Sequence, residues 1–330
     1  MFANLINLNG VMTIQEDILI NTIKKKVLKG NIDNISRTQC YERFYFQYPD
    51  IQWALLAAFV SRNAGWNMCD LKGHTLSDLL TPSYSKQLFL TYERSNWLIF
   101  QDAYPQLLLY HYSTIFNKPW FHLLSIFNVS KFMEKEWNYY WENRDKQRLL
   151  YALIINEQNV IQKPVIEKDI FKRRIFHSLP YKMNDLMHYS IVLFPTLSGE
   201  LYGASVEKFQ KLDERIELGK KLAAILFHEN VFDDFIQFAK RTVHTGSRYD
   251  YEQYFQENII RKTPFLRIAF PIIQQTKSNE ELWDVNRKVK EKWFGPPKLE
   301  KLEPITKWYK KKQKEIEIFI SIKNWFLLNE

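Results

Sequence analysis

Apolar residues recur at a helical period along most of the chain. Ile14, Ile18, Ile23 and Val27 lie four or five positions apart and are followed by Gly30. This spacing predicts a helix that begins near residue 14 and stops at the glycine. By the same criteria, with glycine, proline or a capping residue near the ends, the sequence predicts further helices over 34–47, 50–65, 83–100, 104–117, 119–128, 131–159, 165–178, 205–227, 229–241, 250–260, 265–276, 278–293 and 304–328.

Two segments interrupt the helical pattern. Residues 189–197 are rich in the β-branched and aromatic side chains that are typical of a strand. Since we find no second segment of this kind, we expect an extended connector there. Gln162, Lys163 and Pro164 mark the best boundary, near 160–166, between two packed helical lobes. Residues 1–12 are expected to be a loose N-terminal segment, followed by one helical domain over 13–330.

The composition supports the helical interpretation. Of the 330 residues, 46% are hydrophobic, 25% are charged and 16% are aromatic, which is globular composition with a surplus of aromatic side chains. Only 9 glycines and 12 prolines punctuate the chain. Sandwiches, barrels and dinucleotide-binding folds need many turn residues. The sequence therefore predicts an all-α fold, arranged as an irregular array of many helices.

The charge is basic but unevenly placed. The formal net charge is +9, and Lys310, Lys311, Lys312 and Lys314 lie close together in the predicted last helix. Such a run is either a solvated helix face or a patch that contacts phosphate groups. An anionic ligand, nucleic acid or a lipid surface are the partners that this charge would suit.

Membrane and compartment signals are weak. The sequence has no continuous stretch of about 20 apolar residues, so we expect no transmembrane segment. Cys40 and Cys69 are too few for a disulfide framework, and no secretory leader opens the chain. A cytoplasmic location with free thiols is the natural expectation.

The common catalytic motifs are absent from the sequence. It contains no P-loop, no G-x-G-x-x-G turn, no H-E-x-x-H, no G-x-S-x-G and no paired C-x-x-C. His228, Glu229 and Asp233 could be imagined as metal ligands, but acidic residues at the positive end of a helix explain them equally well. We therefore expect neither a metal nor a cofactor.

Three polar segments carry arginines in a chain where lysine is far more common. They are Asn34–Thr38, Ser61–Asn67 and His244–Tyr251, and each lies at a predicted helix end. Helix starts offer free N–H groups to anions, and the planar guanidinium can complete such a site. The candidate ligand-binding residues are Arg37, Arg62, Asn63, Trp66, Asn67, His244, Ser247 and Arg248, and the candidate catalytic residues are His244 and Asp250.

A purely structural interpretation explains the same residues. Asn34, Ser36 and Asp250 would then cap helices. The arginines would form structural salt bridges or bind the last carbonyls of helices. A site shared by Arg62 and Arg248 requires their guanidinium groups to lie within reach of one anion.

The same segments resemble a known family. The strings Asn34–Thr38 and Ser61–Met68, with Leu201–Gly203 and His244–Tyr251 later in the chain, resemble the YppC-like family of uncharacterised proteins of Gram-positive spore-forming bacteria. The resemblance extends over most of the chain. It implies a bacterial cytoplasmic protein with one family-wide domain, and it transfers no catalytic residue.

Three hypotheses for function follow. The first is a soluble binding or interaction protein with a polar site, lined by Arg, Asn and His, for an anionic group such as phosphate. The alternative is a hydrolase or transferase in which His244 is the general base and Asp250 orients it, while Arg37, Arg62 and Arg248 stabilise negative charge. The third is a peripheral membrane protein that uses the basic last helix.

Overall fold

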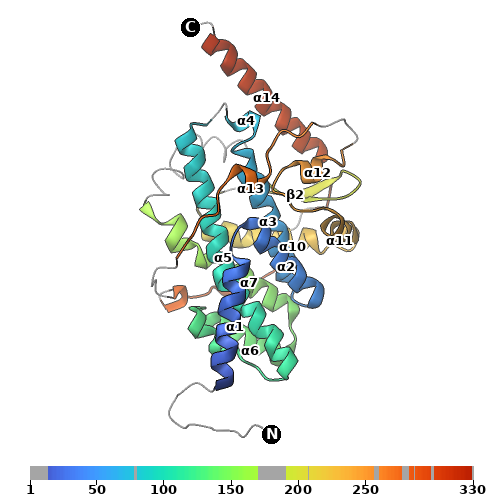
Figure 1. The fold of residues 1–330 in the computed structure, drawn as a ribbon. Helices are drawn as coiled ribbons and strands as arrows, with labels where there is room; N and C mark the ends of the chain where they lie inside the picture. Colours follow the sequence, from blue (N-terminus) through green and yellow to red (C-terminus); the bar gives the residue numbers. More distant parts are fainter. Residues whose placement is uncertain are drawn as a thin grey trace.

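The fold was analysed in a computed structural model. It describes residues 14–77, 80–169, 191–206, 208–255, 260–276, 282–285, 287–298 and 301–328. These residues form a mostly α-helical array with a small two-stranded sheet (Figure 1), so the predicted helical class is confirmed. The loose segment expected at 1–12 and most of the helix expected at 165–178 lie outside the described residues.

Two adjacent helices lie at the centre of the core. α2 covers Asn34–Gln47 and α3 covers Gln52–Asp70. Small residues on α3, among them Ala54 and Ala58, are fully buried and allow the two helices to approach closely. The predicted end at Gly65 is wrong: α3 continues to Asp70, because Trp66, Met68 and Cys69 are also buried against neighbouring elements.

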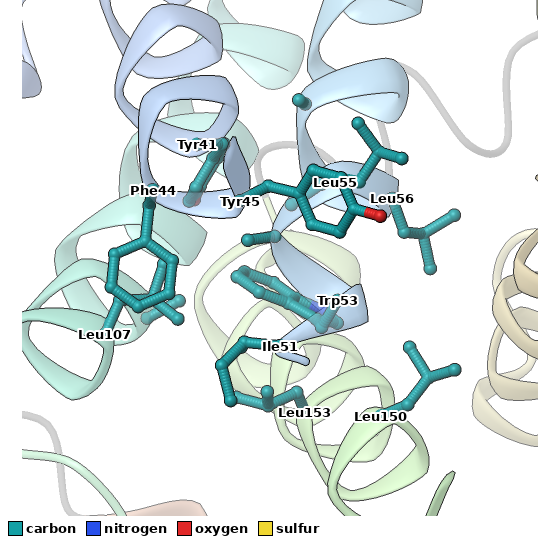
Figure 2. Packing of buried hydrophobic residues seen from close by; sticks show 14 of the residues in the cluster. Tyr41, Phe44, Tyr45, Ile51, Trp53, Leu55, Leu56, Leu107, Leu150 and Leu153 are labelled. Atoms are coloured by element: carbon teal, nitrogen blue, oxygen red, sulfur yellow. The ribbon is translucent and has the colours of Figure 1, made fainter. Parts of the chain in front are cut away.

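Aromatic and aliphatic side chains fill the space around this pair. Figure 2 shows Tyr41 and Phe44 of α2, Trp53 of α3, Leu107 of α5 and Leu153 of α7 converging on one cluster. The ring of Tyr41 meets the ring of Trp53 edge to face, with centroids 5.5 Å apart. Burial of these large side chains provides most of the driving force for assembling the helices.

Longer helices surround the central pair. α1 covers Ile14–Gly30, as predicted, and α5 covers Pro82–Phe116. The prediction of separate helices over 83–100 and 104–117 was wrong, because α5 passes through Pro105, which is buried within it. α4 is a single turn over His74–Ser77, and the segment expected as a helix over 119–128 forms a 3₁₀ helix, η1, over Phe121–Phe127.

The long helix predicted over 131–159 is two helices. α6 covers Lys131–Asn143 and α7 covers Lys146–Val160. Arg144 between them adopts a left-handed conformation with φ 55°, and the side chain of Asp145 accepts a hydrogen bond from the backbone N–H of Arg148 to begin α7. A short π-helical segment, η2, covers Gln162–Ile166 and is largely buried.

The segment expected as a lone connector is a paired strand. β1 covers Ile191–Pro195 and pairs in antiparallel register with β2, which covers Leu201–Ser205. Gly203 lies opposite Leu193 with φ 146°, and a Cβ atom there would stand 1.9 Å from the carbonyl oxygen of Val192. β2 includes Ser205, and the helix predicted over 205–227 begins only at Leu212.

After β2, the described part of the chain contains three helices of ten or more residues and several short ones. The predicted helices over 250–260, 265–276 and 278–293 were wrong, since the described residues there form only turns of three or four residues. The elements are α10 (Leu212–Leu226), α11 (Phe232–Arg241), α12 (Tyr249–Glu252), α13 (Leu266–Ala269), η4 (Trp283–Val285), η5 (Glu291–Phe294) and α14 (Thr306–Leu328). None of the helices in the described ranges is long and apolar enough to cross a membrane.

Candidate functional site

Arg37 is buried between α2 and α5, where its guanidinium is paired with Glu93. Nη1 donates to Oε2 of Glu93 at 2.9 Å, Nη2 donates to Oε1, and Nε donates to Oδ1 of Asn31 at 2.6 Å. The side chains of Arg37 and Glu93 are 0% and 6% exposed. This bidentate pair uses the planar fork of the guanidinium to join two helices. It has the form of a structural salt bridge.

Arg62 on α3 joins three elements. Its Nε donates to Oε1 of Glu42 at 2.8 Å, and its Nη1 and Nη2 donate to the carbonyl oxygens of Thr242 and Ala239 at 3.0 and 3.2 Å. These carbonyls lie at the C-terminal end of α11, where backbone acceptors have no partner within the helix. Arg62 therefore pairs with a carboxylate and completes the end of a helix.

Arg248 holds a different pair of carboxylates. Its Nε lies 2.9 Å from Oδ1 of Asp70 and 3.6 Å from Oε1 of Glu252. Its Nη1 donates to Tyr309 and Gln313 of α14, at 3.0 and 2.7 Å. Burial raises the pKa of Asp70 to about 6, although the charge of Arg248 acts in the opposite direction.

His244 and Asp250 form a buried pair. Nδ1 of His244 lies 3.3 Å from Oδ2 of Asp250, which also accepts from Nε1 of Trp66 at 3.0 Å and from the backbone N–H of Thr245 at 2.9 Å. Burial lowers the pKa of His244, whereas its hydrogen bond to Asp250 acts in the opposite direction. Burial raises the pKa of Asp250, but the hydrogen bonds from His244, Thr245 and Trp66 outweigh it and hold the value below normal.

The other ring nitrogen of His244 has no hydrogen-bond partner among the described residues. Because Nδ1 faces a carboxylate, the favoured tautomer carries its proton there and leaves a lone pair on Nε2. A Cβ atom on Gly65 would stand 2.7 Å from Cε1 and 2.8 Å from Nε2 of this ring, and 3.1 Å from Nδ2 of Asn34. Gly65 thus allows the imidazole to lie directly against α3, close to Asn34.

The other predicted ligand-binding residues, Asn63, Asn67 and Ser247, lie outside the His–Asp pair. The side chain of Asn63 forms two hydrogen bonds with the backbone of Leu193 on β1: Nδ2 donates to the carbonyl oxygen at 2.7 Å, and Oδ1 accepts from the N–H at 2.7 Å. Ser247 donates to the carbonyl of Thr263 at 2.9 Å. Asn67 is half-buried on α3. The structure therefore brings Trp66, His244 and Asp250 together, whereas Arg37, Arg62 and Arg248 each contact different carboxylates.

A cavity of about 270 Å³ lies beside the first turn of α2. We call it the α2 pocket. The rings of Phe89 and Phe270 stack in its wall with centroids 3.9 Å apart and planes 4° apart. The other apolar lining residues are Ile32, Leu266, Pro271, Ile272 and Ile273. Its polar lining residues are Asp33, Asn34, Glu93 and Arg267.

Sequence reasoning did not identify Asp33 or Arg267. Asp33, and neither Asn34 nor Ser36, is the N-cap of α2, since its Oδ1 accepts from the backbone N–H of Ser36 at 2.7 Å. Nε of Arg267 donates to Oδ2 of Asp33 at 2.6 Å. Burial raises the pKa of Asp33, but the bonds from Arg267 and Ser36 outweigh it and lower the net value. Asp33 could have been recognised in the sequence as an acidic residue directly before a predicted helix. Its pairing with Arg267 could not, because the two residues are 234 positions apart.

The described fold and these polar groups define a mostly α-helical protein with a buried His–Asp pair and a small, largely apolar pocket beside the first turn of α2. The chain belongs to the family described as "Protein of unknown function (DUF2515)", whose match covers residues 29–317. It is 44% identical over 309 residues to the "Uncharacterized protein YppC" of Bacillus subtilis (strain 168). That alignment covers 93% of this chain and 96% of the relative, and it confirms the resemblance seen in the sequence. No solved structure matches the chain.

Proposed function

We propose that this protein binds a small molecule with an anionic head and an apolar, preferably aromatic, body in the α2 pocket. The observation that carries the proposal is the position of Arg267 on the pocket wall. Its Nε and Nη2 donate to Asp33, and Nη2 also donates to Ser36 at 3.1 Å, while Nη1 bonds to no residue in the described part of the chain. The guanidinium is thus held in place with the two N–H donors of Nη1 available to a ligand.

The charges around the pocket support an anionic head group. Asp33 is paired with Arg267 and Glu93 is paired with Arg37, so neither carboxylate in the lining is left uncompensated. The N-terminal end of α2 adds a partial positive charge at the same place. A singly charged head such as a carboxylate fits this balance better than a doubly charged phosphate.

The walls support an apolar body. The stacked rings of Phe89 and Phe270 offer an aromatic surface, and a volume of about 270 Å³ suits a small organic molecule. Asn34 lines the pocket and also lies close to Nε2 of His244. The lining therefore contains an arginine and an asparagine, Arg267 and Asn34, whereas His244 is not one of the lining residues. Cys40 and Cys69 are free thiols, which supports placing this binding protein in the cytoplasm.

Calorimetric titration with phenylacetate, hexanoate and inorganic phosphate tests the proposal. We expect phenylacetate to bind most tightly and Arg267→Gln to weaken its binding about 10- to 100-fold, since a charge-assisted hydrogen bond is lost. Ile272→Trp should block the pocket. Ile268→Trp is the matched control, because Ile268 is 78% exposed in the same segment and does not line the pocket. Equal affinity in Arg267→Gln, or no binding by any of the three probes, would contradict the proposal.

The unpaired Nε2 of His244 favours a second candidate, a hydrolase or transferase in which His244 is the general base and Asp250 orients it. The three arginines expected to stabilise charge are paired with Glu93, Glu42 and Asp70, so this candidate depends mainly on the His–Asp pair. Hydrolysis of p-nitrophenyl acetate and p-nitrophenyl phosphate tests it. A rate about 100-fold above that of His244→Gln is expected for a general base, and equal rates would exclude the role on these substrates.

A further inference from the structure

The last helix, α14, is attached to the body along only part of its length. The hydroxyl of Tyr309 contacts the hydroxyl of Tyr251 at 2.7 Å, and Gln313 accepts from Arg248 at 2.7 Å. Ile316 and Ile320 continue the buried side, at 8% and 7% exposure. Beyond this the helix projects away from the rest of the molecule (Figure 1). Its distal end therefore reaches out from the surface.

The outward side of α14 changes character along its length. Residues 307, 311, 314, 318 and 322 are spaced by three or four positions, so they lie on one helix face. The first three are exposed lysines, and the last two are Ile318 and Ile322, which are 59% and 51% exposed. We call this face the α14 stripe. After it the sequence reads Trp325, Phe326, Leu327 and Leu328, with Lys323 as the only charge after Glu317 and before the last residue.

The acidic residues beside the stripe are neutralised. Glu315 is paired with Lys312 at 2.9 Å, and Glu317 is paired with Lys262 at 2.6 Å. Lys312 and, less strongly, Lys311 lower the pKa of Glu315, and the outward face keeps more lysines than acids. A basic segment followed by an apolar end is complementary to a layer of anionic head groups above hydrocarbon.

We infer that the α14 stripe binds the surface of an anionic membrane, with the apolar end of the helix entering one leaflet. Residues 318–328 would span about 16 Å at 1.5 Å per residue, close to half of the roughly 30 Å hydrocarbon core. A second copy of the chain is a poorer occupant. Parallel pairing of two stripes would place lysines against lysines, and antiparallel pairing would place lysines against isoleucines. Nucleic acid would use the lysines but leave the isoleucines exposed.

Sedimentation of the full-length protein with lipid vesicles tests the inference. We expect binding to vesicles of 70% phosphatidylcholine and 30% phosphatidylglycerol and at least tenfold weaker binding to pure phosphatidylcholine, because each lysine near an anionic surface contributes favourably. Ile318→Ser with Ile322→Ser should weaken binding at least tenfold. Lys311→Gln with Lys314→Gln should weaken it roughly tenfold or more and reduce its sensitivity to salt.

Ile115→Ser on α5 is the matched control. Ile115 is 56% exposed, so the control removes a similar apolar side chain away from α14. All substituted residues are at the surface, and circular dichroism should show an unchanged fold. Absence of binding to the anionic vesicles, or unchanged binding in the double-isoleucine variant, would overturn the inference. So would a concentration-dependent dimer that the same isoleucine substitutions abolish.

Discussion

Gly65 lies directly against the imidazole of the His–Asp pair. The imidazole cannot easily move away, because Nδ1 is bonded to Asp250 and the ring also meets Trp66 edge to face, with centroids 6.3 Å apart. It is also buried at 4% exposure. A side chain on Gly65 would therefore push the ring out of hydrogen-bonding position.

We predict that Gly65→Ala lowers the free energy of unfolding by about 1–3 kcal/mol, the usual cost of overpacking a core. In a His244→Ala background only Nδ2 of Asn34, 3.1 Å from the new Cβ, still crowds it, so the same substitution should cost less than about 1 kcal/mol, because alanine also favours a helix. Urea denaturation of the wild type, Gly65→Ala, His244→Ala and the double variant measures the cost of Gly65→Ala with and without the ring. An equal cost in both backgrounds would show that the ring is not what excludes a side chain.

The buried carboxyl group of Glu157 leads to a second prediction, on the pH dependence of stability. Its carboxylate accepts from Nε1 of Trp53 and Nε2 of Gln158, both at 3.0 Å, but burial raises its pKa from 4.5 to about 7. The folded protein therefore holds a proton that the unfolded chain releases between these values. Stability from this group is complete below pH 4.5 and is lost as the pH rises through about 7.

Glu157→Gln should remove this pH dependence, since glutamine keeps an acceptor for Trp53 without a charge. Between pH 5 and pH 8 the wild-type protein should lose roughly 1–3 kcal/mol more than the variant. Chemical denaturation at several pH values measures both slopes. Glu142→Gln on the exposed side of α6 is the control and should leave the slope unchanged; parallel wild-type and Glu157→Gln curves would contradict the prediction.

Among the elements, α2, α3 and α11 depend on Arg62. Its guanidinium contacts Glu42 of α2 and the carbonyls of Ala239 and Thr242 at the end of α11. A lysine offers one ammonium group in place of the fork and cannot reach all three acceptors. The end of α11 would then keep carbonyls without donors.

Arg62→Lys should therefore destabilise the fold by about 1–3 kcal/mol, the cost of leaving a buried acceptor unsatisfied. Differential scanning calorimetry measures the change. Arg43→Lys is the matched control, because Arg43 is exposed on α2 and should change stability by less than about 0.5 kcal/mol. If both variants melt together with the wild type, the buried contacts of Arg62 contribute little.

Across the whole molecule, the two cysteines report on global unfolding. Cys40 and Cys69 are free and buried, at 7% and 0% exposure. Burial also raises the pKa of Cys69, which disfavours the reactive thiolate. Both thiols should consequently react only when the core opens.

We predict that Ellman's reagent titrates two thiols per chain in denaturant and reacts slowly with the folded protein. The rate under native conditions should increase as urea approaches the midpoint of unfolding, because reaction requires an open state. Rapid reaction of both thiols in the folded protein would contradict the burial. Finding none in unreduced, unfolded protein would mean that they are oxidised.

The candidate site shows where prediction from the sequence ends. The segments Asn34–Thr38 and His244–Tyr251 do lie at helix ends, whereas Ser61–Asn67 lies inside α3 and its placement at a helix end was wrong. Nothing local distinguishes Arg37, paired 56 positions away with Glu93, from an arginine that awaits a ligand. Trp66, His244 and Asp250 were singled out and do lie together. Arg267 was missed because its pairing with Asp33 is not visible in either neighbourhood.

By itself, the sequence determined the helical class, the absence of the common catalytic motifs, the family and the helices whose pattern is strong, such as 14–30 and 304–328. The apolar period of a helix and the residues that cap or end it lie within one segment, so they can be recognised without knowing which elements pack against that segment. Only the tertiary structure decided what depends on distant partners. β1 is a strand because β2 pairs with one edge of it and the side chain of Asn63 forms hydrogen bonds with the backbone on the other edge. α5 continues through Pro105 because the burial of its side chains outweighs the loss of one backbone N–H donor. The roles of the arginines were decided in the same way. The fold brings a carboxylate within reach of each of Arg37, Arg62 and Arg248, and these arginines form ion pairs in the interior.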